Sequence, residues 1–154
     1  MTMRLWRAIV VVGLLTPGGP QAPDLTGRWV LVGEVGPGLE AVVPAQQPLT
    51  MDGATVTVER GTRPPSTERY RLDGTEAEVP RVVGQARTCR ALWDGGALVL
   101  SCRQPARGPG GQGQPITTRE VLRLDTEGDL VVERTWRSGT RETVDRWRFR
   151  REDR

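Results

Sequence analysis

Apolar and polar residues alternate in short segments along most of the chain, and Gly, Asp or Pro separates one segment from the next. Such alternation places successive side chains on opposite faces of a β-strand. Helical periodicity is almost absent after the N-terminal region. The pattern therefore predicts an all-β protein, an antiparallel up-and-down meander of about 8–10 strands. We expect the meander to close as a barrel, because closure removes exposed sheet edges, and a two-sheet sandwich is the alternative.

One predicted hairpin surrounds Asp73-Gly74. This dipeptide suits a type I′ turn, in which both central residues have positive φ. The turn would place Arg71 opposite Glu76 and Arg69 opposite Glu78 on one face of the hairpin. Opposite charges that face each other across two strands stabilise such a register. We therefore expect two paired strands on either side of this turn.

A second predicted hairpin has its turn at Gly95-Gly96 and a cysteine at each end. The expected cross-strand pairs are Trp93 with Leu98, Ala91 with Leu100, and Cys89 with Cys102. These are non-hydrogen-bonded pairs, in which facing side chains lie closest, as a cross-strand disulfide requires. The pattern predicts a Cys89–Cys102 disulfide on the core-facing side of the hairpin.

Weaker signals of the same kind complete the meander. The further strands expected are 26–34, 49–51, 54–58, 120–124 and 130–136, with a last strand that ends at Arg151 after a Ser138-Gly139 turn. The Asp125-to-Asp129 loop between two of these strands contains clustered carboxylates that resemble a calcium loop. A glycine-ended hairpin turn explains the same residues, and we expect no metal site there.

The N-terminal 22 residues have the pattern of a signal peptide. Arg4 and Arg7 precede an apolar run from Ala8 to Leu15, and small residues follow as far as Ala22. The run is too short to span a bilayer, which needs about 20 apolar residues, but it suits a signal peptide. A buried first strand is the alternative. We predict that residues 1–22 are removed, that residues 24–154 form the domain, and that the protein is periplasmic or extracellular.

The residue composition narrows the possible functions. All 22 basic residues are Arg, and the chain contains no His. Without the two arginines of the predicted signal peptide, 20 basic residues face 19 acidic ones, a net charge of +1. The charges alternate in sign, so we expect no nucleic-acid partner. The lack of His removes the commonest general base and metal ligand. We predict a monomeric protein that is not an enzyme and has neither catalytic residues nor a cofactor.

The start of the predicted domain, Asp24-Leu-Thr-Gly-Arg-Trp29, resembles the G-x-W motif that opens the lipocalin-like (calycin) barrels. Three later patterns are similar to small secreted bacterial proteins of this type: Tyr70-x-x-Asp73-Gly74-x-Glu76, Trp93-Asp94-Gly95 and Leu124-x-x-x-Gly128-x-Leu130. The resemblance implies a lipocalin-like β-barrel. It also implies that Gly27 and Trp29 lie in the first strand at the closed end, where an Arg of the last strand packs across the Trp.

Arg151 is the best match to that Arg, and Arg148 and Arg150 remain open. Fatty-acid-binding proteins fit less well, because they need a helical lid after the first strand. Residues 34–48 hold too many Gly and Pro for a helix. The superfamily implies either binding of a small apolar molecule inside the barrel or inhibition of a protease. Folds of this type host many functions, so this implication is an analogy.

One group of polar residues falls on the inner face of the last strands. If Leu124 pairs with Leu130, Glu120 faces Arg134 on the apolar face. The turn before the last strand would set Arg134 opposite Thr143. The candidate ligand-binding residues on this face are Glu120, Arg134, Trp136, Asp145 and Trp147.

Two interpretations of this group stay open. It is either a polar anchor in an apolar cavity, as in small-ligand sites, or an ion pair that serves the fold alone. The sequence thus favours an exported, non-enzymatic barrel that binds a small apolar or amphipathic ligand. A secreted protein-interaction module, such as a protease inhibitor, is the alternative.

Overall fold

A computed structural model describes residues 21–34, 46–61, 65–80, 87–106 and 113–152. The predicted signal peptide, apart from its last two residues, therefore lies outside the described residues, as do residues 35–45 of the segment that argued against a helical lid. None of the described residues belongs to a helix, so no apolar helix that could cross a bilayer occurs among them.

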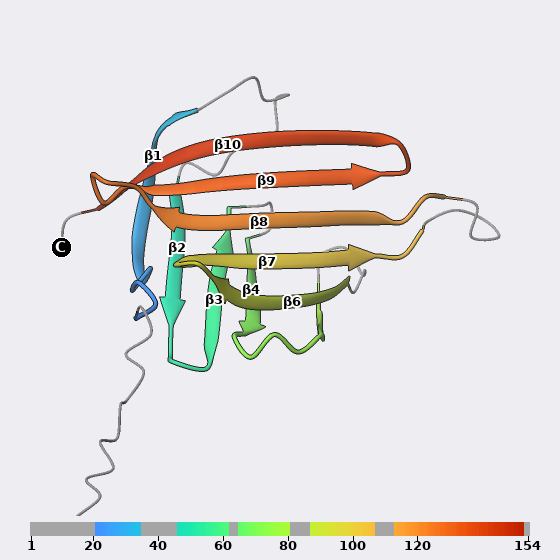
Figure 1. Cartoon of the computed structure of the whole chain (residues 1–154), viewed down its shortest axis with the longest axis horizontal. Helices are drawn as coiled ribbons and strands as arrows, with labels where there is room; N and C mark the ends of the chain where they lie inside the picture. Colours follow the sequence, from blue (N-terminus) through green and yellow to red (C-terminus); the bar gives the residue numbers. More distant parts are fainter. Residues whose placement is uncertain (1–20, 35–45, 62–64, 81–86, 107–112, 153–154) are drawn as a thin grey trace, which may run out of the picture.

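Ten antiparallel strands in the described ranges form one sheet (Figure 1). The strands are β1 (Gly27–Glu34), β2 (Gln46–Met51), β3 (Thr55–Arg60), β4 (Ser66–Arg71), β5 (Ala77–Val79), β6 (Arg87–Asp94), β7 (Ala97–Gln104), β8 (Ile116–Leu124), β9 (Leu130–Ser138) and β10 (Arg141–Arg151). Their order in the sheet is β4-β3-β2-β1-β10-β9-β8-β7-β6-β5. This is an up-and-down meander in which the first strand pairs with the last, and it confirms the predicted all-β barrel class.

The sheet folds over itself into two layers. In Figure 1, strands β6 to β10 run across the view, and β1 to β4 run crosswise behind them. Strand β1 joins the layers, because it pairs with β10 on one side and with β2 on the other. The inner faces of both layers supply the core, whose largest fully buried side chains include Trp29, Leu98, Leu122 and Phe149. The alternation along most strands therefore sends one face inward and the other to solvent, although Val99 of β7 and Val131 of β9 are buried at outward positions.

The barrel stays open between β4 and β5, the two ends of the sheet. The predicted hairpin at Asp73-Gly74 is therefore wrong, because β4 pairs with β3 and β5 pairs with β6. Asp73 accepts hydrogen bonds from the backbone and side chain of Thr75, and Gly74 alone has positive φ, so no type I′ turn forms. The backbone N–H of Gly74 instead donates to the carbonyl of Ala91 at 3.0 Å, across the opening.

The predicted charge pairs of that hairpin are replaced by other contacts. Arg71 pairs with Asp73, two residues away, and Arg69 pairs with Asp52 at 3.1 Å. These pairs are exposed to solvent, so they contribute little to stability. The local charge pattern therefore did not determine which strands pair.

The hairpin β6–β7 has the register that the sequence predicts. Cys89 pairs with Cys102, Ala91 with Leu100 and Trp93 with Leu98. Gly95 and Gly96 both have positive φ, at 54° and 82°, as a type I′ turn requires. A disulfide joins the two cysteines, whose Cα atoms lie 4.1 Å apart, and this confirms the prediction.

The last hairpin differs from the prediction by two residues. Ser138 pairs with Arg141, so the turn consists of Gly139 and Thr140, and Arg134 lies opposite Asp145 and not Thr143. A shift by two residues keeps every side chain on its predicted face, whereas a shift by one would reverse the faces. The neighbouring pair of Glu120 and Arg134 across β8 and β9 is as predicted.

Candidate ligand-binding site

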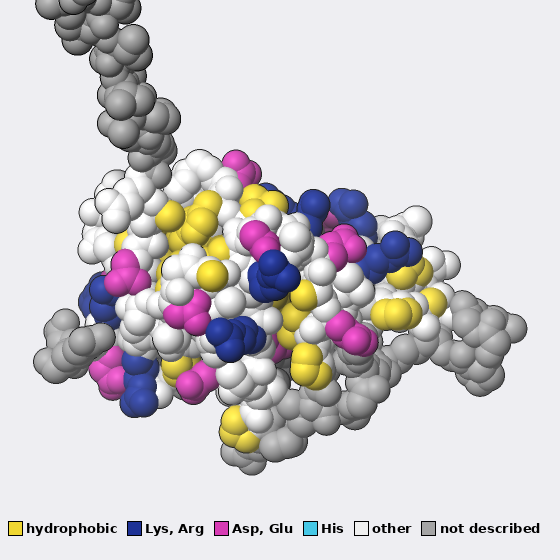
Figure 2. Space-filling view, turned by 90° about the horizontal axis from the view of Figure 1, so that it is seen from below, with side chains coloured by type: hydrophobic (Ala, Val, Ile, Leu, Met, Phe, Trp, Pro, Cys, Tyr) yellow, Lys and Arg dark blue, Asp and Glu magenta, His cyan; other side chains and the backbone are white. Residues whose placement is uncertain are grey.

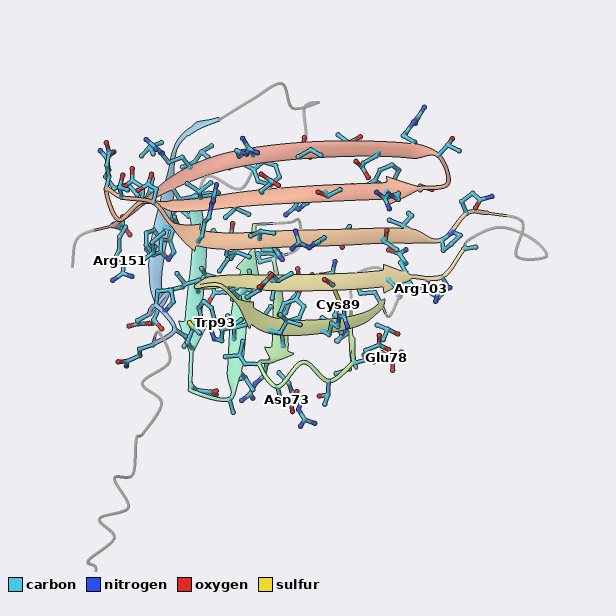
Figure 3. All side chains as sticks on the ribbon, viewed as in Figure 1. Asp73, Glu78, Cys89, Trp93, Arg103 and Arg151 are labelled. Carbon is cyan, nitrogen blue, oxygen red and sulfur yellow. A yellow bond between two sulfur atoms is a disulfide. The ribbon has the colours of Figure 1, made fainter. Side chains whose placement is uncertain are left out.

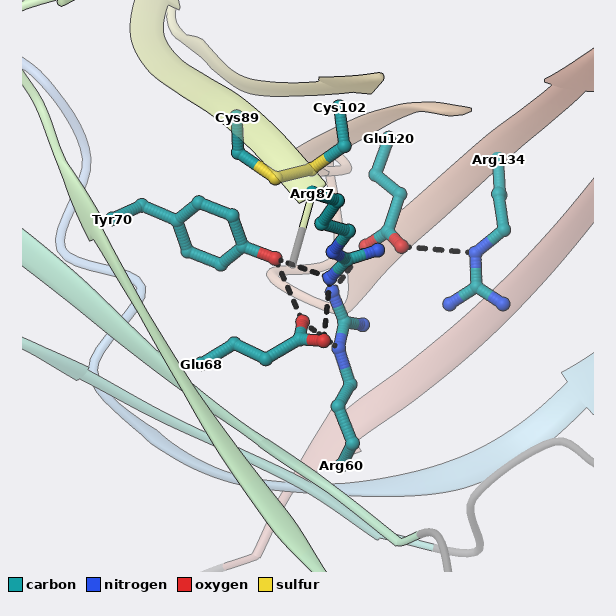
Figure 4. The surroundings of a disulfide bond; sticks show 8 residues. All are labelled: Arg60, Glu68, Tyr70, Arg87, Cys89, Cys102, Glu120 and Arg134. Carbon is teal, nitrogen blue, oxygen red and sulfur yellow. Dashed lines mark hydrogen bonds and ion pairs between the residues drawn. A yellow bond between two sulfur atoms is a disulfide. The ribbon is translucent and has the colours of Figure 1, made fainter. Parts of the chain in front are cut away.

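Charged side chains from both layers meet inside the barrel (Figure 4). We call this set the interior charge cluster; its members are Arg60, Glu68, Tyr70, Arg87, Glu120 and Arg134. Strand alternation sends these residues inward. Arg60 follows the buried Val56 and Val58 at intervals of two, and Glu120 precedes the buried Leu122 in the same way.

Glu68 organises the half of the cluster nearest the open seam. Its Oε2 atom accepts hydrogen bonds from Arg60 Nε at 2.8 Å and from the Tyr70 hydroxyl at 2.7 Å. Arg87 donates from one nitrogen to Glu68 Oε1 and, at 3.0 Å, to the Tyr70 oxygen. Because Glu68 belongs to β4 and Arg87 to β6, this contact joins strands that share no backbone ladder.

Glu120 organises the other half. It accepts hydrogen bonds from Arg60 Nη2 at 3.0 Å and from Arg134 Nε at 2.9 Å. Arg60 therefore bridges the two carboxylates across the barrel, from β3 to β4 on one side and to β8 on the other (Figure 4). Charge-assisted hydrogen bonds of this kind are stronger than neutral ones, especially away from water.

Burial and charge act in opposite directions on these groups. Burial alone would raise the pKa of Glu120, but the attraction of Arg60 and Arg134 outweighs it and lowers that pKa to about 2. Burial likewise opposes ionisation of Glu68, and Arg60 and Arg87 hold its pKa below the ordinary value. Burial raises the pKa of Tyr70, so its hydroxyl stays protonated and donates to Glu68. The two carboxylates are thus ionised at neutral pH.

This arrangement predicts a loss of stability in acid. The pKa of Glu120 is near 4.5 in the unfolded chain and lower in the folded state. Such a group stabilises the fold fully at pH values above 4.5. This contribution to stability is lost as the pH falls toward the folded-state pKa. For Glu120 the difference corresponds to about 3 kcal/mol. Urea unfolding should give a constant free energy above pH 5 and a falling one between pH 4.5 and 2.5. A constant value down to pH 2.5 would contradict these pKa shifts.

Arg134 occupies the more open side of the interior charge cluster. Its side chain is 27% exposed, whereas that of Glu120 is 8% exposed. Its guanidinium carbon lies 4.8 Å from the ring centre of Trp147, a cation–π distance. Beyond its Nε contact with Glu120, Arg134 donates no hydrogen bond to a described residue. Its two Nη atoms are therefore available to another acceptor.

Asp145 lies beside Arg134 in the neighbouring strand. It is 7% exposed, and its Oδ1 atom has no hydrogen-bond partner within the described part of the chain. A buried carboxylate oxygen without a partner is costly, and such atoms often accept from water or a ligand. Trp136 is half-buried on the same face, opposite Thr143. The structure thus gathers the five residues that the sequence selects on one inner face, where Arg134 contacts both Glu120 and Trp147.

Sequence reasoning missed the other half of the cluster. Arg60 and Arg87 lie at strand ends, where an Arg is usually solvated. Glu68 lies in the segment for which the sequence predicts the wrong hairpin, the one around Asp73-Gly74. Strand alternation was the available signal, because Glu68 and Tyr70 share the face opposite to Arg69 and Arg71. What the sequence lacked was the closure that brings β3 and β4 opposite β6 and β8.

The far end of the barrel carries the contact that the calycin resemblance implies. Trp29 is fully buried, and the guanidinium carbon of Arg151 lies 4.7 Å from its ring centre. Arg151 also donates to the carbonyl of Asp24 at 2.9 Å. Gly27 permits this approach, since a Cβ atom there would lie 3.3 Å from Arg151 Nε.

The two other arginines considered for this role act elsewhere. Arg148 pairs with Asp125 at 2.7 Å, and Arg150 pairs with Asp129 at 3.1 Å. The carboxylates of the Asp125-to-Asp129 loop, which include Glu127, are close enough together to hold a cation. These arginines already supply positive charge to them, so the loop carries no argument for a metal.

Comparison with known proteins supports the fold alone. No protein-family profile and no curated protein sequence matches this chain. Among solved structures, the chain is similar to the REP1-NXSQ fatty acid transporter, with a TM-score of 0.57, 16% identity, and 84% of this chain and 97% of that one covered. It is also similar to apo lipid binding protein 8 of Caenorhabditis elegans, with a TM-score of 0.58, 17% identity, and 82% and 94% covered. The structural neighbours of this chain thus include barrels of the fatty-acid-binding type. From the sequence, these barrels fit less well than the lipocalins.

Proposed function

We propose that this protein is a non-enzymatic carrier or sensor that binds a small amphipathic molecule inside its barrel. The observation that carries the proposal is the pair of unused polar groups on one inner face, the Nη atoms of Arg134 and the Oδ1 atom of Asp145. Small-ligand sites typically place a few such groups in an apolar surrounding. The names of the two neighbouring barrel proteins, a fatty acid transporter and a lipid binding protein, support the same class of ligand.

The unused groups also indicate the polar end of the ligand. Arg134 needs an acceptor, and a carboxylate accepts two hydrogen bonds from one guanidinium. Asp145 needs a donor, which a hydroxyl group or a protonated carboxyl group supplies. The apolar part of the ligand would pack against Trp136 and Trp147. A hydroxy fatty acid combines these features, and a plain fatty acid supplies the carboxylate and the apolar chain.

The test of this site compares Arg134→Gln with Arg146→Gln. Arg146 is a matched control, because it lies on the outer face and pairs with Glu133. In displacement of a dansyl-labelled fatty acid, Arg134→Gln is expected to weaken binding by roughly tenfold to a hundredfold, the value of a charged hydrogen bond, and Arg146→Gln to leave it unchanged. Arg134→Gln should still fold, because Glu120 keeps its contact with Arg60. Equal affinities of both variants and the wild type would contradict the assignment of Arg134.

We also propose that the protein is exported as a monomer after removal of residues 1–22. The positively charged start, the short apolar run and the disulfide support this proposal, because disulfides persist in oxidising compartments. The intact mass of protein recovered from the periplasm or the medium should match a chain that begins near Pro23. A recovered chain that still begins at Met1 would refute the signal peptide.

A further inference from the structure

The outer face of β6 to β9 holds an open hollow of about 620 Å³. An arginine from each of the four strands lines it, and we call this feature the arginine groove; its arginines are Arg90, Arg103, Arg119 and Arg137. Arg103 lies toward the end of β7 away from its turn with β6 (Figure 3). The groove is on the opposite side of the sheet from the interior charge cluster, so the two sites are separate.

Guanidinium and hydroxyl groups alternate across the groove. Ser101 of β7 lies between Arg90 and Arg119 in the register of β6, β7 and β8. In the adjacent row, Arg103 lies between Thr88 and Thr117. Adjacent strands are about 5 Å apart, so Arg90 and Arg119 begin roughly 10 Å apart with a hydroxyl between them. The groove therefore offers a regular pattern of cationic and hydroxyl donors.

Three of these arginines have no acidic partner. Arg90, Arg103 and Arg119 are exposed and form no ion pair with any described residue, and only Arg137 is paired, with Glu142. Elsewhere on the outside, most arginines are paired with acids, namely Arg28, Arg69, Arg71, Arg146, Arg148 and Arg150. The face shown in Figure 2 illustrates this, because basic and acidic side chains are interspersed there. Two acids, Glu76 and the Arg137 partner Glu142, also line the groove, so its four arginines leave a local surplus of positive charge on a chain that is otherwise nearly balanced.

The composition of the groove selects among anionic partners. No aromatic side chain lines it, so it lacks the platforms on which single-stranded nucleic acids stack their bases. Of the two large hydrophobic side chains exposed in the described ranges, Val32 lies on β1 and Val144 lies beside the groove residue Thr135. A single valine is not an apolar face that could insert into a membrane. Guanidinium groups bind carboxylates and sulfates, and Thr and Ser hydroxyls bind sugar hydroxyls.

We propose that the arginine groove binds an acidic polysaccharide, with its carboxylate or sulfate groups on Arg90, Arg103 and Arg119. Its hydroxyls would bind the hydroxyl groups beside these arginines, those of Thr88, Ser101 and Thr117. Because the contacts are exposed, binding weakens as salt is added. Because the positive charge is concentrated in the groove, the affinity should depend on Arg90, Arg103 and Arg119. It should depend little on the net charge of the protein.

The test is fluorescence anisotropy with labelled heparin, a sulfated chain, and labelled polygalacturonate, a carboxylated one. The groove variant carries Arg90→Gln, Arg103→Gln and Arg119→Gln. The control variant carries Arg28→Gln, Arg69→Gln and Arg71→Gln, which removes the same charge from exposed sites elsewhere. We expect the wild type and the control to bind at least one chain alike, and the groove variant to bind it about tenfold or more weakly. Comparing the affinities for the two polymers shows whether the groove recognises sulfate or carboxylate groups.

Three outcomes would overturn the proposal. The first is that the wild type binds neither polymer in low salt, and the second is that the two triple variants lose affinity equally. The third is that single-stranded DNA or anionic phospholipid vesicles bind the wild type more tightly than either polymer does. Circular dichroism of both triple variants shows whether they are folded. If the groove variant is unfolded, the single substitution Arg119→Gln with Arg69→Gln as its control applies the same criterion.

Discussion

Replacing Glu120 with Gln is expected to lower the free energy of unfolding by about 3–5 kcal/mol, the cost of removing one partner from a buried ion pair. Glu120 holds Arg60 at 3.0 Å and Arg134 at 2.9 Å in the interior of the barrel. Gln has nearly the same volume, so the loss reports charge and not a cavity. The substitution leaves Glu68 to balance the buried guanidinium groups of both Arg60 and Arg87.

Glu133→Gln provides the matched control. Glu133 lies on the same pair of strands as Arg134 but faces outward, where it pairs with the exposed Arg146. Its loss should cost less than about 1 kcal/mol. Urea unfolding at pH 7, followed by far-ultraviolet circular dichroism, measures both. Equal effects of the two substitutions would show that the interior charge cluster does not contribute as described.

Removing the disulfide is expected to cost about 3 kcal/mol. Cys89 and Cys102 are 13 residues apart in sequence, so the bond restricts a short loop of the unfolded chain. Both are buried beside the interior charge cluster, and the double variant Cys89→Ala with Cys102→Ala avoids leaving buried thiols or hydroxyls. Urea unfolding of this variant against the oxidised wild type gives the difference. Titration of the unfolded, unreduced wild type should find no free thiol; two reactive thiols would contradict the bond.

The parts of the fold that the sequence predicts correctly are those decided by contacts close in the chain. The register of β6 with β7 follows from two adjacent glycines and an apolar face that ends in cysteines. The register of β8 with β9 follows from Leu124 and Leu130 on either side of a short loop. In each case a shift of the register by one residue would expose an apolar face to solvent. The free energy lost in this way far exceeds what a better turn could contribute.

The parts that it misses depend on closure of the sheet. Asp73-Gly74 looks like a hairpin turn, yet it lies at the open seam, because β4 finds six partners on β3. The same closure brings Arg60 and Arg87 to Glu68 and Glu120. Nothing local to Arg60 indicates a partner 60 residues away. Alternation predicts which side chains point inward, but only the strand order decides which of them meet.

We assign the two halves of the interior charge cluster to different roles, one to stability and the other to ligand binding. Arg60, Glu68, Tyr70 and Arg87 satisfy one another near the seam. Arg134, in contrast, contacts Glu120 through Nε alone and is partly exposed beside Trp147. The structure contains the ion pair at Glu120, and the ligand anchor at Arg134 stays a proposal.

Isothermal titration calorimetry of the wild type with dodecanoate, at several temperatures and two salt concentrations, tests the proposed ligand site most directly. We expect saturable binding at one site per chain with a negative change in heat capacity, which marks burial of apolar surface. Binding should persist in high salt, because the site is inside the barrel. No saturable binding, or binding that disappears in high salt without a heat-capacity change, would contradict a ligand in the interior.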